Sequence, residues 1–514
     1  MDRRKFLLQS SAAAAVACSA RCRAQDAPGV TVELMEREGQ SANQVPLTYM
    51  GLSYELAQLT DPNFFSAPNR DLVAYFRLLS RHGVLRLGGN TSEFCWFQAD
   101  ASTPEPKLHV PAGSLDANWM PHRQFAIIPA AIDALAGFLR ATEWRLIYGL
   151  NFGNSTPERA AAEAAYVMRQ AGDRLEFFQI GNEPDLYHRA SNGTRPPEWG
   201  FQDYGKEWVS FAEAIVAKAP GARFGGPDVA ASSDWVTKFG DAIGEKLASR
   251  LVAMTGHYYA EGPPNDPLVT TERLLGGNPK LTGEMNAIEE TARARSLIYR
   301  MTEGNTCYRG GKPGMSNAFA SALWAGDYLL ELASLGCAGV NLHGGTGAML
   351  SAGLGDHTPG LEVAKTPQAM RAGFYTPIFA EPGSDIKAMP IFYGMLLANE
   401  FAGCTMMNAN AEMQGVNATA YAAKHEAGFK VAIFNKDASK AIDVSVRAPR
   451  KSTAAAVWRL EAPALDSTED VTLAGARILP HGEWNHRVAE PVEVRDGMAR
   501  IRLRAASAAL LFLA

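Results

Sequence analysis

Eight strand-like runs alternate with helix-like runs from about residue 48 to residue 402, and this alternation constrains the fold more than any other feature of the chain. Strands that alternate with helices build a parallel sheet covered by helices. Eight such repeats predict an α/β fold in which the sheet closes into a (β/α)8 TIM barrel. A doubly wound open sheet is disfavoured, because no glycine-rich dinucleotide turn follows the first strand. The strand candidates are Tyr49–Tyr54, Val84–Leu87, Arg145–Leu150, Leu175–Ile180, Arg223–Gly226, Ala253–Tyr258, Leu297–Thr302 and Ala338–Leu342.

The stretches between the strand candidates have helical spacing and recognisable ends. Leu72, Phe76 and Leu79 recur on one helical face. An alanine-rich run begins at Pro157 and stops at Gly172, residue types that favour the first turn and the end of a helix. A further run opens at Ser316 and stops at Gly336. These signals predict helices between the strands.

After Gly403 the pattern changes to period two. Ile442, Val444 and Val446 alternate with polar residues, and no helical stretch interrupts the alternation. This pattern predicts an antiparallel β-sandwich domain over residues 403–514, beside the barrel over residues 48–402. The segment Val30–Glu38 also alternates, so residues 25–47 are expected to add a strand to the β-domain.

Residues 1–24 have the composition of an export signal. A charged start with Arg3, Arg4 and Lys5 precedes an apolar, alanine-rich run and a small residue at a plausible cleavage site. The Arg-Arg-x-Phe-Leu order indicates the twin-arginine route. We therefore expect a periplasmic or extracellular protein. The alternatives are a disordered cytosolic tail and a lipoprotein cleaved before Cys18.

Charge and cysteine content exclude several classes of function. The chain has 49 basic and 54 acidic residues, and loss of five basic and one acidic residue with segment 1–24 would leave 44 and 53, a net charge of −9. Such a protein has no general attraction for nucleic acid or a highly sulfated polyanion. A hydrophobic content of 47% fits a soluble globular protein rather than a membrane protein. The remaining cysteines form no Cys-x-x-Cys pair, which argues against a zinc knuckle and a disulfide framework: Cys95, Cys307, Cys337 and Cys404.

Two glutamates follow strand candidates. Catalytic side chains of such barrels lie at the C-terminal ends of the strands. Glu183 follows the fourth strand in "FFQIGNEPDLY", and a buried carboxylate is costly unless it is paired or used. Glu303 follows the seventh strand in "IYRMTEGNTCYRGG", and we expect the strand to end there. Glu284 is set aside, because Met285 and Ile288 continue at helical spacing and place it in or near the first turn of a helix.

Two glutamates that face one cleft meet the chemical needs of glycoside hydrolysis. One carboxyl group with a raised pKa protonates the leaving oxygen, and the other attacks the anomeric carbon. A single glutamate at a strand end is a turn residue or an ion-pair partner about as often as it is a catalytic residue. The pairing of the fourth and seventh strands favours catalysis.

Longer motifs resemble one family. Asn182-Glu183-Pro184 after the fourth strand and Glu303 after the seventh resemble the retaining glycosidases built on eightfold barrels. Over residues 49–402 the chain resembles glycoside hydrolase family 79, the family of heparanase and the bacterial β-glucuronidases, and the trailing β-domain fits that layout. Asn-Glu-Pro is shared by many barrel glycosidases, whereas the strings around Glu303 and Glu55 are more selective. The motifs are "SYELAQLTDPNFF", "LRLGGN", "QIGNEPD", "GPDV", "HYY" and "EGNTCYRGG" followed by "SNAFASALW".

The resemblance implies catalytic and sugar-binding roles for the matching residues at four strand ends. Glu183 would be the acid/base and Glu303 the nucleophile. Asn182 would hydrogen-bond the sugar 2-hydroxyl near the nucleophile, a contact that strengthens in the transition state. Glu55 and Asn90 would hold other sugar hydroxyls.

The resemblance also implies a site for the carboxylate of a uronic acid. Tyr259 matches a tyrosine that lies near the nucleophile in the family. Tyr308 and the backbone amides of Gly310 and Gly311 would receive the carboxylate, since successive N–H groups can form an anion-binding concavity. Tyr375 would complete this site.

The chain departs from the family pattern in places. Arg309 stands where heparanase has another glycine, so it either adds charge to the carboxylate pocket or blocks it. "GPDVAAS" lacks the glutamine that follows this motif in heparanase, which leaves contacts beyond the cleaved sugar open. The long loop from Gly344 to Arg371 is expected to close over the pocket. His257 either orients a carboxylate or substrate or packs in the core, and Arg86 either orients the nucleophile or serves internal ion pairs.

The sequence therefore predicts an exported, retaining exo-β-glucuronidase. It would release terminal β-D-glucuronic acid from a glucuronide or oligosaccharide by a two-glutamate double displacement, without a metal or organic cofactor. The alternatives are an endo-acting uronidase of the heparanase or hyaluronidase type, a xylosidase or glucosidase of a related family, and an inactive carbohydrate-binding barrel. The aglycone and the oligomeric state stay open.

Overall fold

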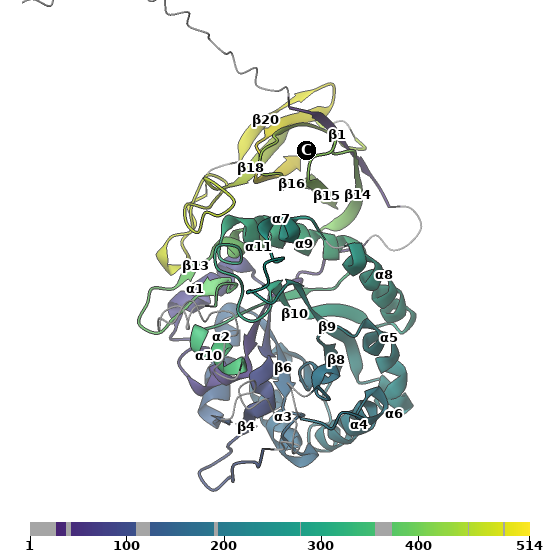
Figure 1. Cartoon of the computed structure of the whole chain (residues 1–514), viewed down its shortest axis with the longest axis vertical. Coiled ribbons are helices and arrows are strands. Elements are labelled where there is room, and N and C mark those ends of the chain that lie inside the picture. Colours follow the sequence, from purple (N-terminus) through teal and green to yellow (C-terminus); the bar gives the residue numbers. More distant parts are fainter. Residues whose placement is uncertain are drawn as a thin grey trace, which may run out of the picture.

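The chain folds into a barrel and a β-domain, which lies at the top of Figure 1. The computed structural model describes residues 27–37, 43–108, 124–189, 194–277, 279–354, 373–450, 452–486 and 489–514. The expected export segment 1–24 lies outside these residues, as does the part of the long loop from 355 to 371. Within the described ranges, no helix combines the length and apolar character needed to cross a membrane.

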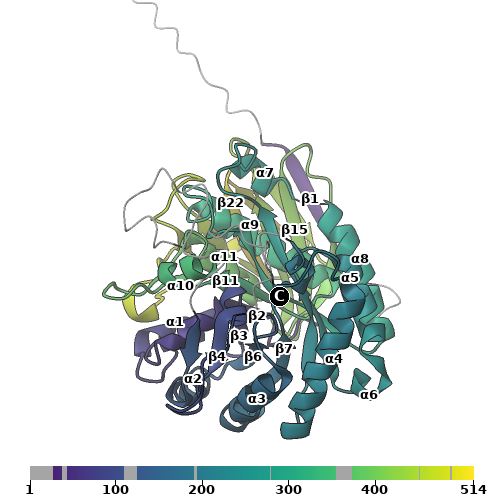
Figure 2. The same ribbon diagram turned by 60° about the horizontal axis from the view of Figure 1, so that its bottom comes forward.

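The predicted (β/α)8 barrel is confirmed. Eight parallel strands close on themselves, and helices surround them (Figures 1 and 2). Strands such as β2, β3 and β11 are buried at every position, which explains why their sequences are continuous runs rather than alternating ones. The barrel strands are β2 Met50–Glu55, β3 Val84–Gly88, β6 Arg145–Leu150, β7 Leu175–Ile180, β8 Phe224–Val229, β9 Leu251–Glu261, β10 Ile298–Cys307 and β11 Val340–Gly344.

Strand β10 continues to Cys307, whereas the sequence predicted its end at Glu303. The reason is the long neighbouring strand β9, which offers backbone partners beyond that point. A register shift between Met301 and Glu303 interrupts the pairing, after which Glu303 pairs with His257 and Cys307 with Glu261. The irregularity makes Glu303 and His257 direct neighbours on adjacent strands.

Local signals set most helix ends. Thr156 accepts a hydrogen bond from the Arg159 N–H at the start of α3, and the helix ends at Gly172, whose φ of 57° suits glycine. The helix predicted to open at Ser316 begins instead at Phe319. The Ser316 hydroxyl accepts a hydrogen bond from the Lys312 N–H and so belongs to the preceding turn. The helices are α1 Arg70–Leu79, α2 Pro129–Thr142, α3 Pro157–Ala171, α4 Phe201–Lys218, α5 Ser233–Ala242, α6 Gly244–Ala248, α7 Thr271–Leu275, α8 Pro279–Ala294, α9 Phe319–Leu335, α10 Gly347–Gly353 and α11 Pro390–Asn399, with 3-10 turns η1 Leu56–Thr60, η2 Asn90–Phe94, η3 Gly172–Arg174, η4 Pro184–Leu186 and η6 Pro480–Gly482.

The β-domain is one ten-stranded sheet that curls until β18 also pairs with β22. It encloses its own apolar core, to which Val32, Val431 and Val444 contribute. Its pairs are antiparallel except for β1, which runs parallel to β17 and antiparallel to β14. The strands are β1 Gly29–Met35, β14 Thr405–Ala411, β15 Ala418–His425, β16 Gly428–Asn435, β17 Ile442–Arg447, β18 Ala455–Glu461, β19 Thr472–Leu473, β20 Glu490–Arg495, β21 Met498–Leu503 and β22 Ser507–Leu513; two small pairs are β4 Cys95–Phe97 with β5 Phe125–Ile127, and β12 Ile378–Phe379 with β13 Lys387–Ala388.

Helix α9 joins the two parts. Its Asp327 accepts hydrogen bonds from Lys436 (2.5 Å), Thr419 (2.5 Å) and Tyr421 (2.8 Å) of the β-domain. The Phe434 ring packs so closely on Gly326 that a side chain there would collide with it. The β-domain therefore supports the barrel wall on the side of α9.

Candidate active site

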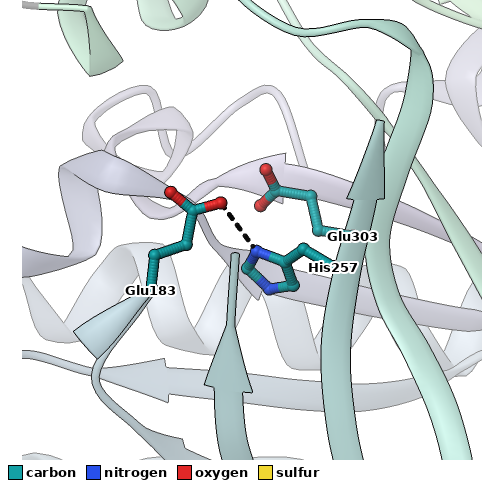
Figure 3. Close-up of side chains that lie close together, drawn as sticks. All are labelled: Glu183, His257 and Glu303. Carbon is teal, nitrogen blue, oxygen red and sulfur yellow. Dashed lines mark hydrogen bonds and ion pairs between the residues drawn. The ribbon is translucent and has the colours of Figure 1, made fainter. Parts of the chain in front are cut away.

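Glu183 and Glu303 face each other at the C-terminal end of the barrel (Figure 3). Glu183 directly follows the turn after β7, and Glu303 lies in β10. One carboxylate oxygen of each lies within 4.8 Å of the other and of a ring nitrogen of His257. The fold thus brings together two carboxyl groups that are far apart in the sequence.

The backbone turns sharply at Glu183. This residue has a left-handed conformation, with φ 52° and ψ 49°. Such a conformation costs a residue with a side chain about 1–2 kcal/mol, so the surroundings must hold it. Its N–H donates to the carbonyl of Asp228 (2.9 Å), and Pro184 begins η4 immediately afterwards.

The Arg86 guanidinium, from β3, lies fully buried beneath the carboxylates. Gly88 leaves room for it, because a Cβ there would lie 2.5 Å from the guanidinium carbon. Arg86 therefore contacts the candidate nucleophile and also forms the centre of the internal ion pairs of the barrel. The acceptors of its hydrogen bonds are Glu303 Oε2 (2.5 Å), Asp228 Oδ2 (2.6 Å), Asn182 Oδ1 (2.8 Å), Gln179 Oε1 (3.0 Å) and Ser53 Oγ (3.0 Å).

His257 links Glu183 to the buried Asp228. Its Nδ1 lies 3.0 Å from Glu183 Oε1, and its Nε2 lies 3.1 Å from Asp228 Oδ1. Asp228 also accepts hydrogen bonds from Thr302 Oγ1 (2.5 Å) and Gln179 Nε2. The Asp228 carboxylate therefore lies between two cationic groups, Arg86 and His257, each of which contacts one of the two glutamates.

These contacts move the pKa values of the two glutamates in opposite directions. Burial raises the pKa of Glu183, and the charge of Glu303 adds to the rise while His257 opposes it. Burial alone would raise the pKa of Glu303 as well, but His343, His257 and Arg86 outweigh it and lower the pKa. Glu183 is therefore easier to protonate than an ordinary glutamate, whereas Glu303 is held as the carboxylate.

His257 is held as a cation. Burial alone would lower its pKa, but the charges of Asp228 and Glu303 raise the pKa to about 10. Glu183, His257 and Glu303 are a group that offers three ligand atoms to a metal ion. A protonated imidazole has no free nitrogen lone pair, however, so this charge state disfavours metal binding at neutral pH.

Two further side chains contact Glu303. The Tyr259 hydroxyl donates to Glu303 Oε1 (2.7 Å), and His343 Nδ1 lies 3.5 Å from Glu303 Oε2. His343 Nε2 lies 3.6 Å from Glu55 Oε1. Tyr259 thus lies beside Glu303 as the resemblance implied, while His343 had no role in the sequence-based prediction.

Three polar residues line one side of the carboxylates. Asn182 Nδ2 donates to Asn90 Oδ1 (3.1 Å), and Asn90 Nδ2 donates to the carbonyl of Gly353 in α10 (3.1 Å). Glu55 Oε2 accepts from the N–H and the hydroxyl of Thr91 (2.8 and 2.7 Å). Glu55 packs directly on Gly353, so α10 covers this side of the site.

The segment expected to bind a carboxylate lies beside Tyr259. The Tyr308 ring is 6.4 Å from the Tyr259 ring, and the Tyr375 ring is 6.2 Å from it. Gly310 and Gly311 have φ values of 85° and 90°, a region that favours glycine. The carbonyl of Gly310 accepts from the Phe374 N–H (2.7 Å), which brings the segment of Tyr375 against this turn.

Arg309 and Tyr308 form the outer part of this segment. The Arg309 guanidinium lies 5.7 Å from the centre of the Tyr308 ring, and Tyr308 is 36% exposed. Arg309 also has a positive φ of 61°, so three consecutive residues with positive φ form the turn that ends at Gly311.

Sequence reasoning missed several buried polar residues beneath the site. Asp228 lies in the quoted motif "GPDV" but had no role, and Gln179 and Thr302 point inward from strands that read simply as apolar. Glu93 accepts a hydrogen bond from the Asn182 N–H (2.8 Å). Its position just after "LRLGGN" was the one signal that could have drawn attention to it.

Two curated relatives are β-glucuronidases. No family model matches the chain. It is 26% identical to a β-glucuronidase of Aspergillus niger over 310 residues, which is 56% of this chain and 55% of that protein. It is 27% identical to a β-glucuronidase of Neurospora crassa over 354 residues, 61% of this chain and 60% of that protein. The chain thus spans less than two thirds of the length of either relative.

Solved structures share the fold over nearly the whole chain. A 4-O-α-L-rhamnosyl-β-D-glucuronidase from Fusarium oxysporum has a TM-score of 0.70 and 16% identity, and covers 94% of this chain and 100% of its own. A family 51 arabinofuranosidase from Xanthomonas axonopodis pv. citri has a TM-score of 0.64, 16% identity and the same coverage. At these identities the likeness establishes the fold. Assignment to glycoside hydrolase family 79 stays a prediction.

Proposed function

We propose that the chain is a glycoside hydrolase, and more narrowly a retaining β-glucuronidase that removes terminal β-D-glucuronic acid. The observation that carries this proposal is the pair Glu183 and Glu303: one carboxylate oxygen of each lies within 4.8 Å of the other, and their pKa values are displaced in opposite directions. So short a distance between oxygen atoms suits the closely spaced carboxyl pair of retaining enzymes, about 5–5.5 Å, better than the pair of inverting enzymes, about 6.5–9.5 Å apart to accommodate a water molecule. The sequence relatives support the glucuronide as substrate.

The charges suit a double displacement. Glu303, held ionised by Arg86 and His343, attacks the anomeric carbon, while protonated Glu183 gives its proton to the leaving oxygen. Once the aglycone has left, Glu183 is a carboxylate that takes a proton from the incoming water. The water then releases glucuronate with its β configuration retained. Arg86 holds Glu303 in place, and Asn182, which accepts a hydrogen bond from Arg86, holds the sugar 2-hydroxyl beside it.

Recognition of the uronate is assigned to the turn at Tyr308, Gly310 and Gly311. Positive φ values at the two glycines orient successive N–H groups, an arrangement that suits an anion. Arg309 adds a positive charge next to this turn. The cover formed by α10 over Glu55 and Asn90 favours trimming of a terminal sugar over cleavage within a polymer.

The test is release of p-nitrophenol from p-nitrophenyl β-D-glucuronide, with the β-glucoside and β-xyloside as matched neutral substrates. We expect turnover of the glucuronide, lost in Glu303→Ala and in Glu183→Ala. Turnover of the neutral glycosides alone would refute the proposed carboxylate site but would leave the catalytic roles of the two glutamates intact. No turnover of any of the three, followed by cleavage of a uronic acid polymer, would identify an endo-acting enzyme instead.

We further propose that the enzyme is exported, on the basis of the charged and apolar pattern of residues 1–24. Fractionation of cells that express the full chain tests this. Wild-type activity that stays in the cytosol would contradict export, and export that persists in Arg3→Lys with Arg4→Lys would contradict the twin-arginine route.

A further inference from the structure

Glu93 is a buried carboxylate just behind the proposed acid/base. It lies in η2, directly after β3, and is 2% exposed. Among the described residues, no lysine, arginine or histidine forms an ion pair with it, and burial raises its pKa. An unpaired buried carboxyl group is expensive unless hydrogen-bond donors surround it. The positions of its hydrogen-bond donors therefore show which segments Glu93 holds in place.

The donors come from the ends of two neighbouring barrel strands. Glu93 Oε2 accepts from the N–H groups of Phe152 (3.0 Å) and Gly153, in the loop after β6. Glu93 Oε1 accepts from the Asn182 N–H (2.8 Å), in the turn after β7, and the Tyr187 hydroxyl also donates to this carboxylate. One side chain thus connects both loops to η2, which carries Asn90.

The Asn182 N–H is one of two consecutive backbone anchors that lead into the proposed acid. The other is the Glu183 N–H, which donates to the carbonyl of Asp228 (2.9 Å). Immediately after them the chain takes the left-handed conformation at Glu183, whose carbonyl accepts from the Leu186 N–H (2.9 Å) on the other side. A strained backbone of this kind persists only where neighbouring contacts determine it on both sides. Loss of the Glu93 anchor would leave the direction of the Glu183 side chain under-determined.

We propose that Glu93 is a positioning residue that fixes the Asn182–Glu183 turn for proton transfer to the leaving group. This inference rests on the proposed glucuronidase function. Glu93 itself touches neither of the two catalytic carboxyl groups in the contacts described above. Its effect on the reaction must therefore pass through the backbone of Asn182.

The test uses Glu93→Gln, which keeps the size of the side chain but turns one accepting oxygen into an NH2 group. That group cannot accept from a backbone N–H. The matched control is Glu163→Gln in α3, because Glu163 is also buried, at 4% exposure, and its carboxylate accepts from the Tyr148 hydroxyl (2.7 Å). A second variant, Tyr187→Phe, removes one donor from Glu93 and one acceptor from the Asn182 N–H, and it avoids a new polar group in the core.

The readout is kcat/KM for aryl β-D-glucuronides with leaving groups from 2,4-dinitrophenol to phenol. Proton donation matters for a poor leaving group and hardly at all for a good one. General acid catalysis contributes about 10²–10⁴-fold, so a misplaced acid should cost Glu93→Gln roughly tenfold to 100-fold on the phenyl glucuronide. We expect almost no loss on the dinitrophenyl glucuronide, a smaller loss of the same kind in Tyr187→Phe, and none in Glu163→Gln.

Two results would overturn the proposal. One is an equal loss across the leaving-group series, which would mean that Glu93 only stabilises the fold. The other is no loss on the phenyl glucuronide in either variant. If Glu93→Gln does not fold, Tyr187→Phe decides by the same two criteria. A wild type that cleaves none of the glucuronides would refute the proposed function instead, which separates the two failures.

Discussion

The charge of His257 gives a prediction whose size follows from the structure. His257→Asn keeps an NH2 donor near the position of Nδ1 but removes the positive charge 3.0 Å from Glu183 Oε1. Hydrogen bonds to a charged partner contribute about 1.5–3 kcal/mol, against about 0.5–1.5 kcal/mol for neutral ones. The difference of about 1–1.5 kcal/mol favours the ionised form of Glu183 in the wild type, and corresponds to about one pKa unit.

Because a nearby cation lowers the pKa of Glu183, its removal raises that pKa further. The proposed acid works while it is protonated, so activity is present below its pKa and is lost as pH rises through it. We therefore expect the alkaline limb of the kcat/KM profile to move upward by about one pH unit in His257→Asn.

The assay is kcat/KM for p-nitrophenyl β-D-glucuronide across the acidic and alkaline limbs. A matched control is His343→Asn, because His343 lies 3.5 Å from Glu303 rather than beside Glu183. That control should raise the pKa of Glu303 from about 2 and bring the acidic limb upward while the alkaline limb stays in place. An alkaline limb that stays in place or moves to lower pH in His257→Asn would refute the reasoning.

Three further substitutions test the other contacts. Arg86→Lys removes the planar group that serves five acceptors and should lower the free energy of unfolding by about 3–5 kcal/mol, measured by urea denaturation; an unchanged midpoint would contradict it. Tyr259→Phe removes the 2.7 Å hydrogen bond to Glu303, so kcat/KM should fall roughly fivefold to tenfold, about 1–1.4 kcal/mol, and the acidic limb should rise. Gly311→Ala places a Cβ 2.8 Å from the Tyr375 amide nitrogen at a φ of 90°, so KM for the glucuronide should rise about tenfold, about 1.4 kcal/mol, and an unchanged KM would exclude this turn as the carboxylate site.

The barrel could be predicted because its strands are buried on both faces. Each then appears as a short apolar run, and the intervening helices carry their own end signals, such as Thr156 and Gly172. The positions of Glu183 and Glu303 followed from counting strands, since side chains at the C-terminal ends of barrel strands share one face. These properties depend on local sequence and on topology alone.

The contacts among Arg86, Asp228 and His257 could not be predicted in this way. They join side chains from three strands, and which of them meet depends on register. The shift between Met301 and Glu303 is a tertiary feature without a sequence signature, and so is the pairing with β9 that extends β10 past the expected end. The displaced pKa values of the two glutamates follow from these contacts, so they too required the structure.

The position of β1 has a consequence for how the protein is made and engineered. This strand lies between β14 and β17, so the β-domain sheet forms only when a segment that precedes the barrel pairs with segments that follow it. During synthesis the barrel can form long before the β-domain is complete. A variant that lacks residues 29–35 would expose two open sheet edges and tend to aggregate. A synthetic peptide of these seven residues should then restore solubility by occupying the gap, which would make the β-domain a natural starting point for a split-enzyme reporter.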